Sequence, residues 1–159
     1  MRLLLIIFFA IIGLDQYTKY VIYNKLELYE SIPVIDGFFN ITYVLNPGAA
    51  FGFLANLNEK IRVLFFVVVT IIAISLVIYL LKKEWNHKIR RLAYIFILSG
   101  AIGNLIDRIW LGKVIDFLDF YIKSYHWPAF NVADTSISIG VGLLLLDIVI
   151  LSNRKDINR

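Results

Sequence analysis

The chain contains no cysteine, and this absence removes several kinds of chemistry. Without a thiol there is no disulfide framework, no cysteine nucleophile and no thiolate metal site. The H-E-x-x-H zinc motif, the G-x-S-x-G serine elbow and a glycine-rich phosphate loop are also absent. The net charge of +4 does not indicate nucleic acid as a partner. A zinc protease, a serine hydrolase and a phosphate-loop enzyme are therefore not expected.

The chain contains more long apolar runs than a soluble protein of this length. Hydrophobic residues make up 60% of the sequence, whereas a soluble domain of this length is usually less than about half apolar. A membrane-spanning helix needs about 20 mostly apolar residues. The runs predict an all-α membrane protein with a single membrane domain over 1–159. Its four helices are expected near 2–23, 61–82, 90–110 and 132–152, with outer segments at 24–60 and 111–131.

Basic residues give the expected orientation in the membrane. They gather in the short segment "KKEWNHKIRR", 82–91, and in the tail, at Arg154, Lys155 and Arg159. Short loops rich in lysine and arginine stay in the cytoplasm. We therefore expect both termini and 82–91 to be cytoplasmic. The first apolar run is expected to be an uncleaved helix, because no small-x-small cleavage site follows it.

The two outer segments carry turn and strand patterns. The stretch "IPVIDGFFNITYVL" places Asp36-Gly37 between apolar runs, which predicts a β-hairpin. "NPGAAFG", 46–52, has the composition of a turn. "VIDFLDFYIKSYHWPAF" is aromatic-rich, as expected at a membrane interface, and Asp119 within it is expected to be a solvated loop residue. His87 and His126 are predicted on opposite sides of the membrane, so no shared metal site is expected.

Polar residues that lipid tolerates poorly lie mostly toward the outer side in this topology. Ionisable groups within a span are costly and suggest function. Four separated parts of the chain bring such groups, and the amides near them, to one membrane depth. The residues are Asp15, Lys19, Asn46, Asn104, Asp107, Arg108, Asp116, Asn131 and Asp134.

Structural roles remain open for several of these residues. Asp15 and Lys19, four residues apart, form either a structural ion pair or part of a substrate-facing site. Asp107 and Arg108 could end a helix and pair internally. Either Asn131 or Asp134 could cap the last helix, because both residue types are favoured at that position.

Catalysis by a pair of aspartates remains possible once zinc, serine and phosphate-loop chemistry are excluded. Two neighbouring carboxyl groups can share one proton, so that one activates water while the other protonates a carbonyl oxygen. Asp116 and Asp134 are the best candidates, because both lie in apolar context at the outer interface. The alternative is a small polytopic transporter or ion-coupled membrane subunit. That alternative predicts polar residues through the whole membrane depth and often two related halves, and neither is visible here.

Five short blocks resemble the ordered motifs of one enzyme family. They are "LDQYTKY" (14–20), "NPGAAFG" (46–52), "GNLIDR" (103–108), "VIDFLDF" (114–120) and "FNVADTSISIG" (130–140). In this order, across four expected spans, they resemble bacterial lipoprotein signal peptidase, or signal peptidase II. The resemblance implies an intramembrane aspartic peptidase that cuts prolipoproteins before their diacylglyceryl-modified cysteine.

The resemblance also implies roles, partners and a location. The catalytic pair would be Asp116 and Asp134, with Asn46, Asn104, Arg108 and Asn131 holding substrate. Structural support would come from Asp15, Lys19, Asp107 and Gly48. The expected fold is a four-helix membrane bundle with a small extracytoplasmic β cradle and a short outer helical segment, to which 51–60 could contribute. Lipidated prolipoproteins and membrane lipids are the expected partners of a monomer in the bacterial cytoplasmic membrane, with its active site toward the outer face and no metal or cofactor.

Overall fold

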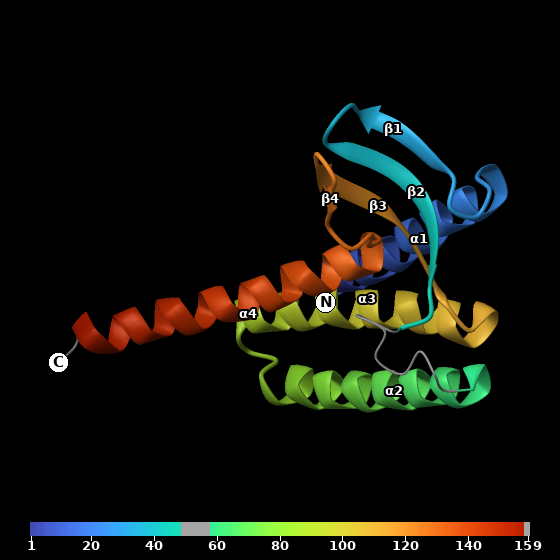
Figure 1. The fold of residues 1–159 in the computed structure, drawn as a ribbon. Helices are drawn as coiled ribbons and strands as arrows, with labels where there is room; N and C mark the ends of the chain where they lie inside the picture. Colours follow the sequence, from blue (N-terminus) through green and yellow to red (C-terminus); the bar gives the residue numbers. More distant parts are fainter. Residues whose placement is uncertain (49–57, 158–159) are drawn as a thin grey trace.

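A bundle of helices carries a small antiparallel sheet at one end (Figure 1). The computed structural model describes residues 1–48 and 58–157. The sheet stands where α1 and α3 end and α4 begins, so the polar ends of three helices face one another beneath it.

The described residues contain four helices that are long and apolar enough to cross a membrane, as the apolar runs predict. Their observed ends lie within a few residues of the expected ones, except that α4 continues beyond 152. They are α1 (Arg2–Lys25), α2 (Glu59–Lys83), α3 (Lys88–Leu111) and α4 (Val132–Ile157). Asn58 caps α2 by accepting from the Lys60 amide, and Gly112, with φ of 70°, ends α3 in the left-handed conformation that glycine favours.

Helix α3 is the centre of the bundle, since it contacts each of the other three. Its interface with α4 is built from small residues, and Ala93 and Ala133 are fully buried there. The backbones approach so closely that a Cβ on Gly140 would lie 2.6 Å from the Ala93 carbonyl oxygen. Small residues allow this kind of close packing between membrane helices. The α3–α4 contact therefore fixes the start of α4 against the end of α3.

The sheet has four strands in the order β1-β2-β3-β4. They are β1 (Ser31–Ile35), β2 (Phe39–Asn46), β3 (Val114–Ile122) and β4 (Tyr125–His126). The hairpin predicted at Asp36-Gly37 is confirmed, with Gly37 at φ of 75° in the turn. The prediction for 111–131 lacked strands, and the structure corrects it: 114–122 is the strand that pairs with β2. Of the expected outer helical segment, 51–57 lie outside the described residues, and Glu59 and Lys60 belong to α2.

The sheet is held to the bundle by a small apolar core. Ile22 of α1, Tyr43 of β2, and Ile115 and Phe117 of β3 are buried together. Burying each such side chain contributes about 1.5–3 kcal/mol. Because Ile115 and Phe117 flank Asp116, this core also fixes the position of the aspartate between them.

The other end of the bundle is tied by an ion pair. Arg90 Nε at the start of α3 donates to Asp147 Oδ2 of α4 at 2.6 Å. Asp147, within the apolar part of α4, thus has its partner in the basic 82–91 segment.

Candidate active site

Asp116 lies on β3 and is only 2% exposed. Its two carboxyl oxygens accept hydrogen bonds from two amide side chains: Asn46 Nδ2 donates to Oδ2 at 2.9 Å, and Asn131 Nδ2 donates to Oδ1 at 2.7 Å. Burial raises the pKa of the Asp116 carboxyl to about 7. The hydrogen bonds from Asn46 and Asn131 oppose that rise, while the negative charge of Asp134 adds to it. Near neutral pH this carboxyl can therefore either hold or release a proton.

Asp134 lies in the first turn of α4. Its backbone amide donates to Asn131 Oδ1 at 2.9 Å, and the Asn131 amide donates back to Asp134 Oδ2 at 3.3 Å. This reciprocal pair is the arrangement of a capping box. Asn131 is therefore the cap, and Asp134 is its partner inside the helix. The other oxygen, Oδ1, accepts from Asn104 Nδ2 at 2.7 Å.

Asn131 connects the two aspartates and is fully buried. Its Nδ2 donates to Asp116 while its Oδ1 accepts from the Asp134 backbone. Asn131 Nδ2 also lies 3.2 Å from Asn104 Oδ1. The two amide side chains are therefore in contact, one donating to Asp116 and the other to Asp134. Residues from β2, β3, α3 and α4 thus meet at one point, as the four separated polar segments of the sequence indicated.

Lys19 supports this network from α1. It is 2% exposed, and its ammonium contacts Asp15 Oδ2 and Asp107 Oδ2 at 2.9 Å each and donates to Asn104 Oδ1 at 3.0 Å. These three contacts use all the hydrogens of an ammonium group. Because Lys19 occupies the Asn104 oxygen, the Asn104 amide nitrogen points at Asp134. Of the two roles left open for Asp15 and Lys19, the geometry favours the structural ion pair.

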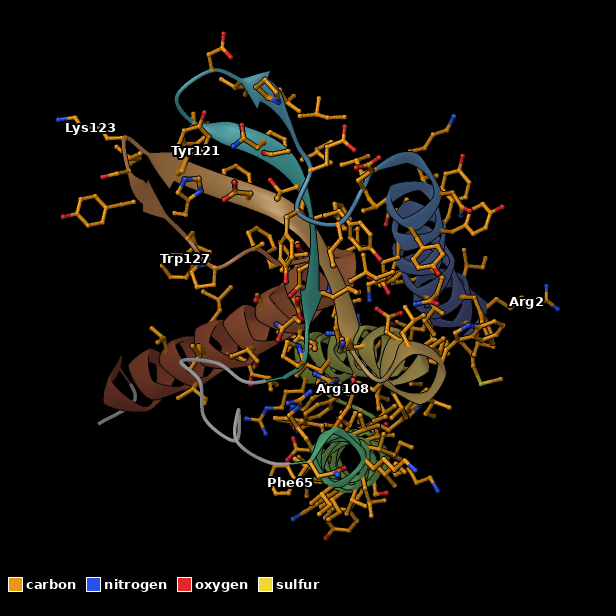
Figure 2. All side chains as sticks on the ribbon, turned by 45° about the vertical axis from the view of Figure 1, so that its right-hand side comes forward. Arg2, Phe65, Arg108, Tyr121, Lys123 and Trp127 are labelled. Carbon is orange, nitrogen blue, oxygen red and sulfur yellow. The ribbon has the colours of Figure 1, made fainter. Side chains whose placement is uncertain are left out.

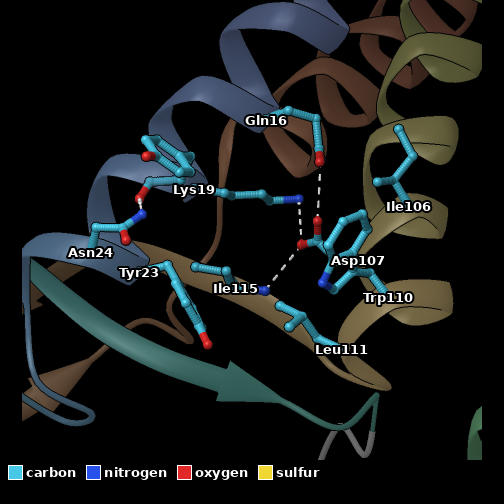
Figure 3. Close-up of a pocket in the computed structure, with 10 residues that line it drawn as sticks. Gln16, Lys19, Tyr23, Asn24, Ile106, Asp107, Trp110, Leu111 and Ile115 are labelled. Carbon is cyan, nitrogen blue, oxygen red and sulfur yellow. Dashed lines mark hydrogen bonds and ion pairs between the residues drawn. The ribbon is translucent and has the colours of Figure 1, made fainter.

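Asp15 and Asp107 each satisfy a backbone amide of another element. The Ala133 amide at the start of α4 donates to Asp15 Oδ1 at 2.8 Å. The Ile115 amide on β3 donates to Asp107 Oδ2 at 3.1 Å (Figure 3). A carboxylate at the start of a helix also interacts favourably with the helix dipole. The two carboxylates therefore hold the backbone immediately before Asp134 and Asp116.

Gln16 belongs to this support, although its sequence context assigned it no role. Its amide donates to Asp107 Oδ1 at 3.1 Å (Figure 3). The same amide lies 3.1 Å from the Gly103 carbonyl oxygen and from Asp15 Oδ2. Its position between Asp15 and Lys19, within the block "LDQYTKY", was the available indication. A cavity of about 290 Å³ lies between α1 and α3, and its polar lining includes Gln16, Lys19 and Asp107 (Figure 3).

Gly48 and Arg108 lie on the α2 side of the site. The Gly48 amide donates to Asn46 Oδ1 at 2.8 Å, which orients the amide that reaches Asp116. Its φ is 86°, and an added Cβ would lie 2.6 Å from the Phe66 ring. The Arg108 guanidinium lies 5.8 Å from the centre of the same ring, as a cation–π contact. Within residues 1–48 and 58–149, Arg108 makes no hydrogen bond to either aspartate of the pair.

An apolar cavity opens beside Asp134. Its volume is about 680 Å³, and one wall is the segment 127–130 while the other is the outer face of α4 at Thr135, Ser138 and Ile139. Figure 2 shows Trp127 between the sheet and α4. An apolar chain placed in this cavity would lie next to the Asp134 carboxyl. No group of three or more potential metal ligands occurs in the described part of the chain.

Asp119 differs from its expected state. We expected a solvated loop residue, but Asp119 is on β3, 7% exposed, and accepts hydrogen bonds from Asn40 and Thr42 of β2. His126, which looked isolated in the sequence, lies 2.8 Å from Asp119 through its Nδ1. The unpredicted strand β3 is what brings these residues together.

Known proteins similar to this chain share its length and its fold. The family model described as signal peptidase (SPase) II matches residues 7–150. The chain belongs to the signal peptidase II family.

Its relatives are lipoprotein signal peptidases. That of Syntrophus aciditrophicus is 56% identical over 137 residues, covering 86% of this chain and 85% of the relative. That of Geobacter sulfurreducens is 50% identical over 143 residues, covering 89% and 88%. A solved bacterial membrane enzyme superposes with a TM-score of 0.86 at 35% identity, covering 98% of this chain and 92% of that one. This signal peptidase II family member is therefore a membrane-associated aspartic peptidase with the expected four apolar helices.

Proposed function

We propose that this chain removes the signal peptide from diacylglyceryl-modified prolipoproteins by cutting before the lipidated cysteine, with Asp116 and Asp134 as the catalytic pair. The observation that carries the proposal is the single buried network in which Asn131 contacts both aspartates. Asn46 and Asn104 each supply a further amide to one of them. The transporter alternative is not retained, because the chain belongs to a peptidase family.

The two carboxyl groups act on one water molecule and one peptide carbonyl. One carboxylate takes a proton from water as its oxygen attacks the carbonyl carbon, and the other carboxyl group protonates the carbonyl oxygen. The carboxyl group that took the water proton then gives it to the cysteine amine as the C–N bond breaks, and the other carboxylate takes back the hydroxyl proton of the intermediate as the C=O bond re-forms. Both carboxyl groups return to their starting state, with one proton between them. This reaction needs no metal or cofactor and forms no covalent intermediate.

The amide groups hold the carboxylates without neutralising them. Asn46, Asn104 and Asn131 donate hydrogen bonds but carry no charge, so the pair keeps its ability to hold one proton. The buried Lys19 ammonium does not contact either aspartate of the pair directly. It contacts Asn104, which in turn donates to Asp134. Arg108, whose charge lies within range of both aspartates, is the proposed contact for the substrate backbone beside the network.

We place the reaction at the outer face of the bacterial cytoplasmic membrane. Support comes from the basic residues of 82–91, which favour the cytoplasm and lie at the opposite end of the helices from the aspartates. The β sheet would then be an extracytoplasmic cradle over the site, and both termini would be cytoplasmic. A monomer suffices, since both aspartates belong to one chain.

Asp116→Asn and Asp134→Asn test the proposal directly. Each variant keeps the shape of the side chain but cannot exchange the proton, so cleavage of a diacylated precursor should fall by at least about 10²-fold. The precursor shift on a gel measures this, and the unlipidated precursor should remain uncut by wild type. Asp36→Asn, in the exposed β1–β2 turn, is the matched control and should cleave normally. Normal cleavage by either Asp116→Asn or Asp134→Asn would contradict the assignment of these two residues as the catalytic pair.

A further inference from the structure

A second polar cluster lies on the sheet, outside the catalytic network. Asp119 is its centre: Oδ1 lies 2.8 Å from His126 Nδ1, and Oδ2 accepts from Asn40 Nδ2 at 3.2 Å and Thr42 Oγ1 at 3.4 Å. The His126 side chain is half exposed, whereas Asp119 is buried. One buried carboxyl group thus joins β2, β3 and β4.

This cluster holds a weak element in place. Strand β4 has only two residues and pairs with β3 at Tyr121–His126 and Ile122–Tyr125. The turn between the strands places Lys123 at φ of 56°, which is unfavourable for a residue other than glycine. So short a strand is marginal by backbone pairing alone. The His126 ring is additionally stacked on Tyr121, at 4.8 Å and 9° between planes, so side chains supply much of the attachment.

The chain that leaves His126 forms the wall of the cavity beside Asp134. The Trp127 amide donates to the Phe120 carbonyl at 2.8 Å, and 127–130 then line the cavity. Phe130 stacks on Phe120 at 5.8 Å, and Asn131 follows it directly. In Figure 2, Trp127 faces α4 while Lys123 lies at the far tip of the hairpin. One end of this wall is thus attached by the Asp119–His126 pair together with the Trp127 amide, and the other end by the backbone hydrogen bonds between Phe130 and Leu118 of β3.

We propose that Asp119 and His126 are positioning residues that set the 127–130 wall against α4, and so determine how well the apolar part of the substrate beside the scissile bond is held. The inference rests on the proposed function. Neither residue touches Asp116 or Asp134, whose hydrogen bonds come from Asn46, Asn104 and Asn131. Loss of the pair therefore changes substrate binding while the catalytic network stays assembled.

Kinetics with a synthetic diacylated precursor peptide separate this role from a general structural one. His126→Ala removes the hydrogen bond to Asp119 and the ring stacked on Tyr121, and KM should rise about ten-fold while kcat stays within about two-fold of wild type. His126→Asn places an amide nitrogen near the position of Nδ1 and should restore most of the wild-type KM. Asp119→Ala also removes the contacts to Asn40 and Thr42, and it should raise KM at least as much as His126→Ala does. Ser124→Ala, exposed in the same hairpin, should leave both constants unchanged.

The outcomes separate the inference from the function on which it rests. A wild-type KM in His126→Ala, or a fall in kcat with KM unchanged, overturns the positioning role, provided that Asp116→Asn is inactive. Failure of His126→Asn to restore KM also overturns it. Normal cleavage by Asp116→Asn overturns the proposed function instead. If His126→Ala does not fold, Trp127 fluorescence is measured instead, in a background in which Trp85 and Trp110 are replaced by phenylalanine. In that background, a Trp127 emission spectrum that Asp119→Asn leaves unchanged contradicts the inference, and a shifted spectrum supports it.

Discussion

Lys19 shows how one residue can support a site without contacting the two carboxyl groups at its centre. A lysine buried in a membrane bundle is costly unless its charge is paired. Its two carboxylate partners, Asp15 and Asp107, in turn hold the backbone of α4 and β3. Its third contact, Asn104, reaches Asp134. The ion pair is therefore part of the frame that fixes both aspartates.

Lys19→Met tests this arrangement. Methionine fills similar volume but leaves two buried carboxylates facing each other, and removing one partner of a buried ion pair costs about 3–5 kcal/mol. We expect a marked fall in the thermal unfolding temperature measured in detergent micelles, together with loss of cleavage. Lys25→Met, on the exposed end of the same helix, is the control and should be near neutral. Equal unfolding temperatures for the two variants would contradict the role assigned to Lys19.

At the scale of elements, the α3–α4 interface sets the distance between Asn104 and Asp134. Gly140 lies in this interface, whereas Gly142, two residues on, has no atom within 4 Å of where its Cβ would be. Gly140→Ala must push α4 away from the α3 backbone, and such overpacking costs about 1–3 kcal/mol. Gly142→Ala should be neutral or stabilise the helix by up to about 1 kcal/mol. Chemical denaturation in mixed micelles measures both, and equal destabilisation by the two variants would refute close packing as the cause.

The elements were predictable to different degrees. The helices followed from runs of apolar residues, and the β1–β2 hairpin followed from Asp36-Gly37, because both patterns are local. Strand β3 was missed although "VIDFLDFYI" is rich in β-forming residues. Asp116 and Asp119 obscured it, since aspartate is depleted in strands. Both are accommodated by partners distant in sequence, such as Asn46 and Asn40, which no local pattern reveals.

At the scale of the whole molecule, the depth of the polar residues predicted that they would gather, but not how they bond. Topology placed Asn46, Asn104, Asp116 and Asp134 at one depth, and the fold brings them together. Which of these residues contacts which depends on side-chain geometry, which the sequence does not reveal. Asn131 caps α4 while bridging Asp116 and Asp134, and Lys19 contacts Asn104 instead of either of these two carboxyl groups. Gln16 gave no comparable pattern of its own.

Enclosing Asp116 between sheet and bundle has a consequence for pH dependence. An exposed aspartate loses its proton near pH 4, but burial raises the pKa of Asp116 to about 7. The pair needs one proton, so cleavage should decline as pH rises through about 7, when that proton is lost. The hydrogen bond from Asn46 stabilises the charged form and lowers this pKa. Asn46→Ala should therefore reduce the rate and also move the alkaline limb to higher pH.

A pH–rate profile with the diacylated precursor measures both effects. Thermal unfolding measured at each pH shows whether the protein stays folded across the range, so that a falling rate reports ionisation and not denaturation. Wild-type activity that stays constant from pH 6 to about 9 would contradict a proton shared by the pair. A limb that moves to lower pH in Asn46→Ala would contradict the direction in which Asn46 acts. The same enclosure that makes an aspartate costly in this apolar chain is then what keeps its proton available at neutral pH.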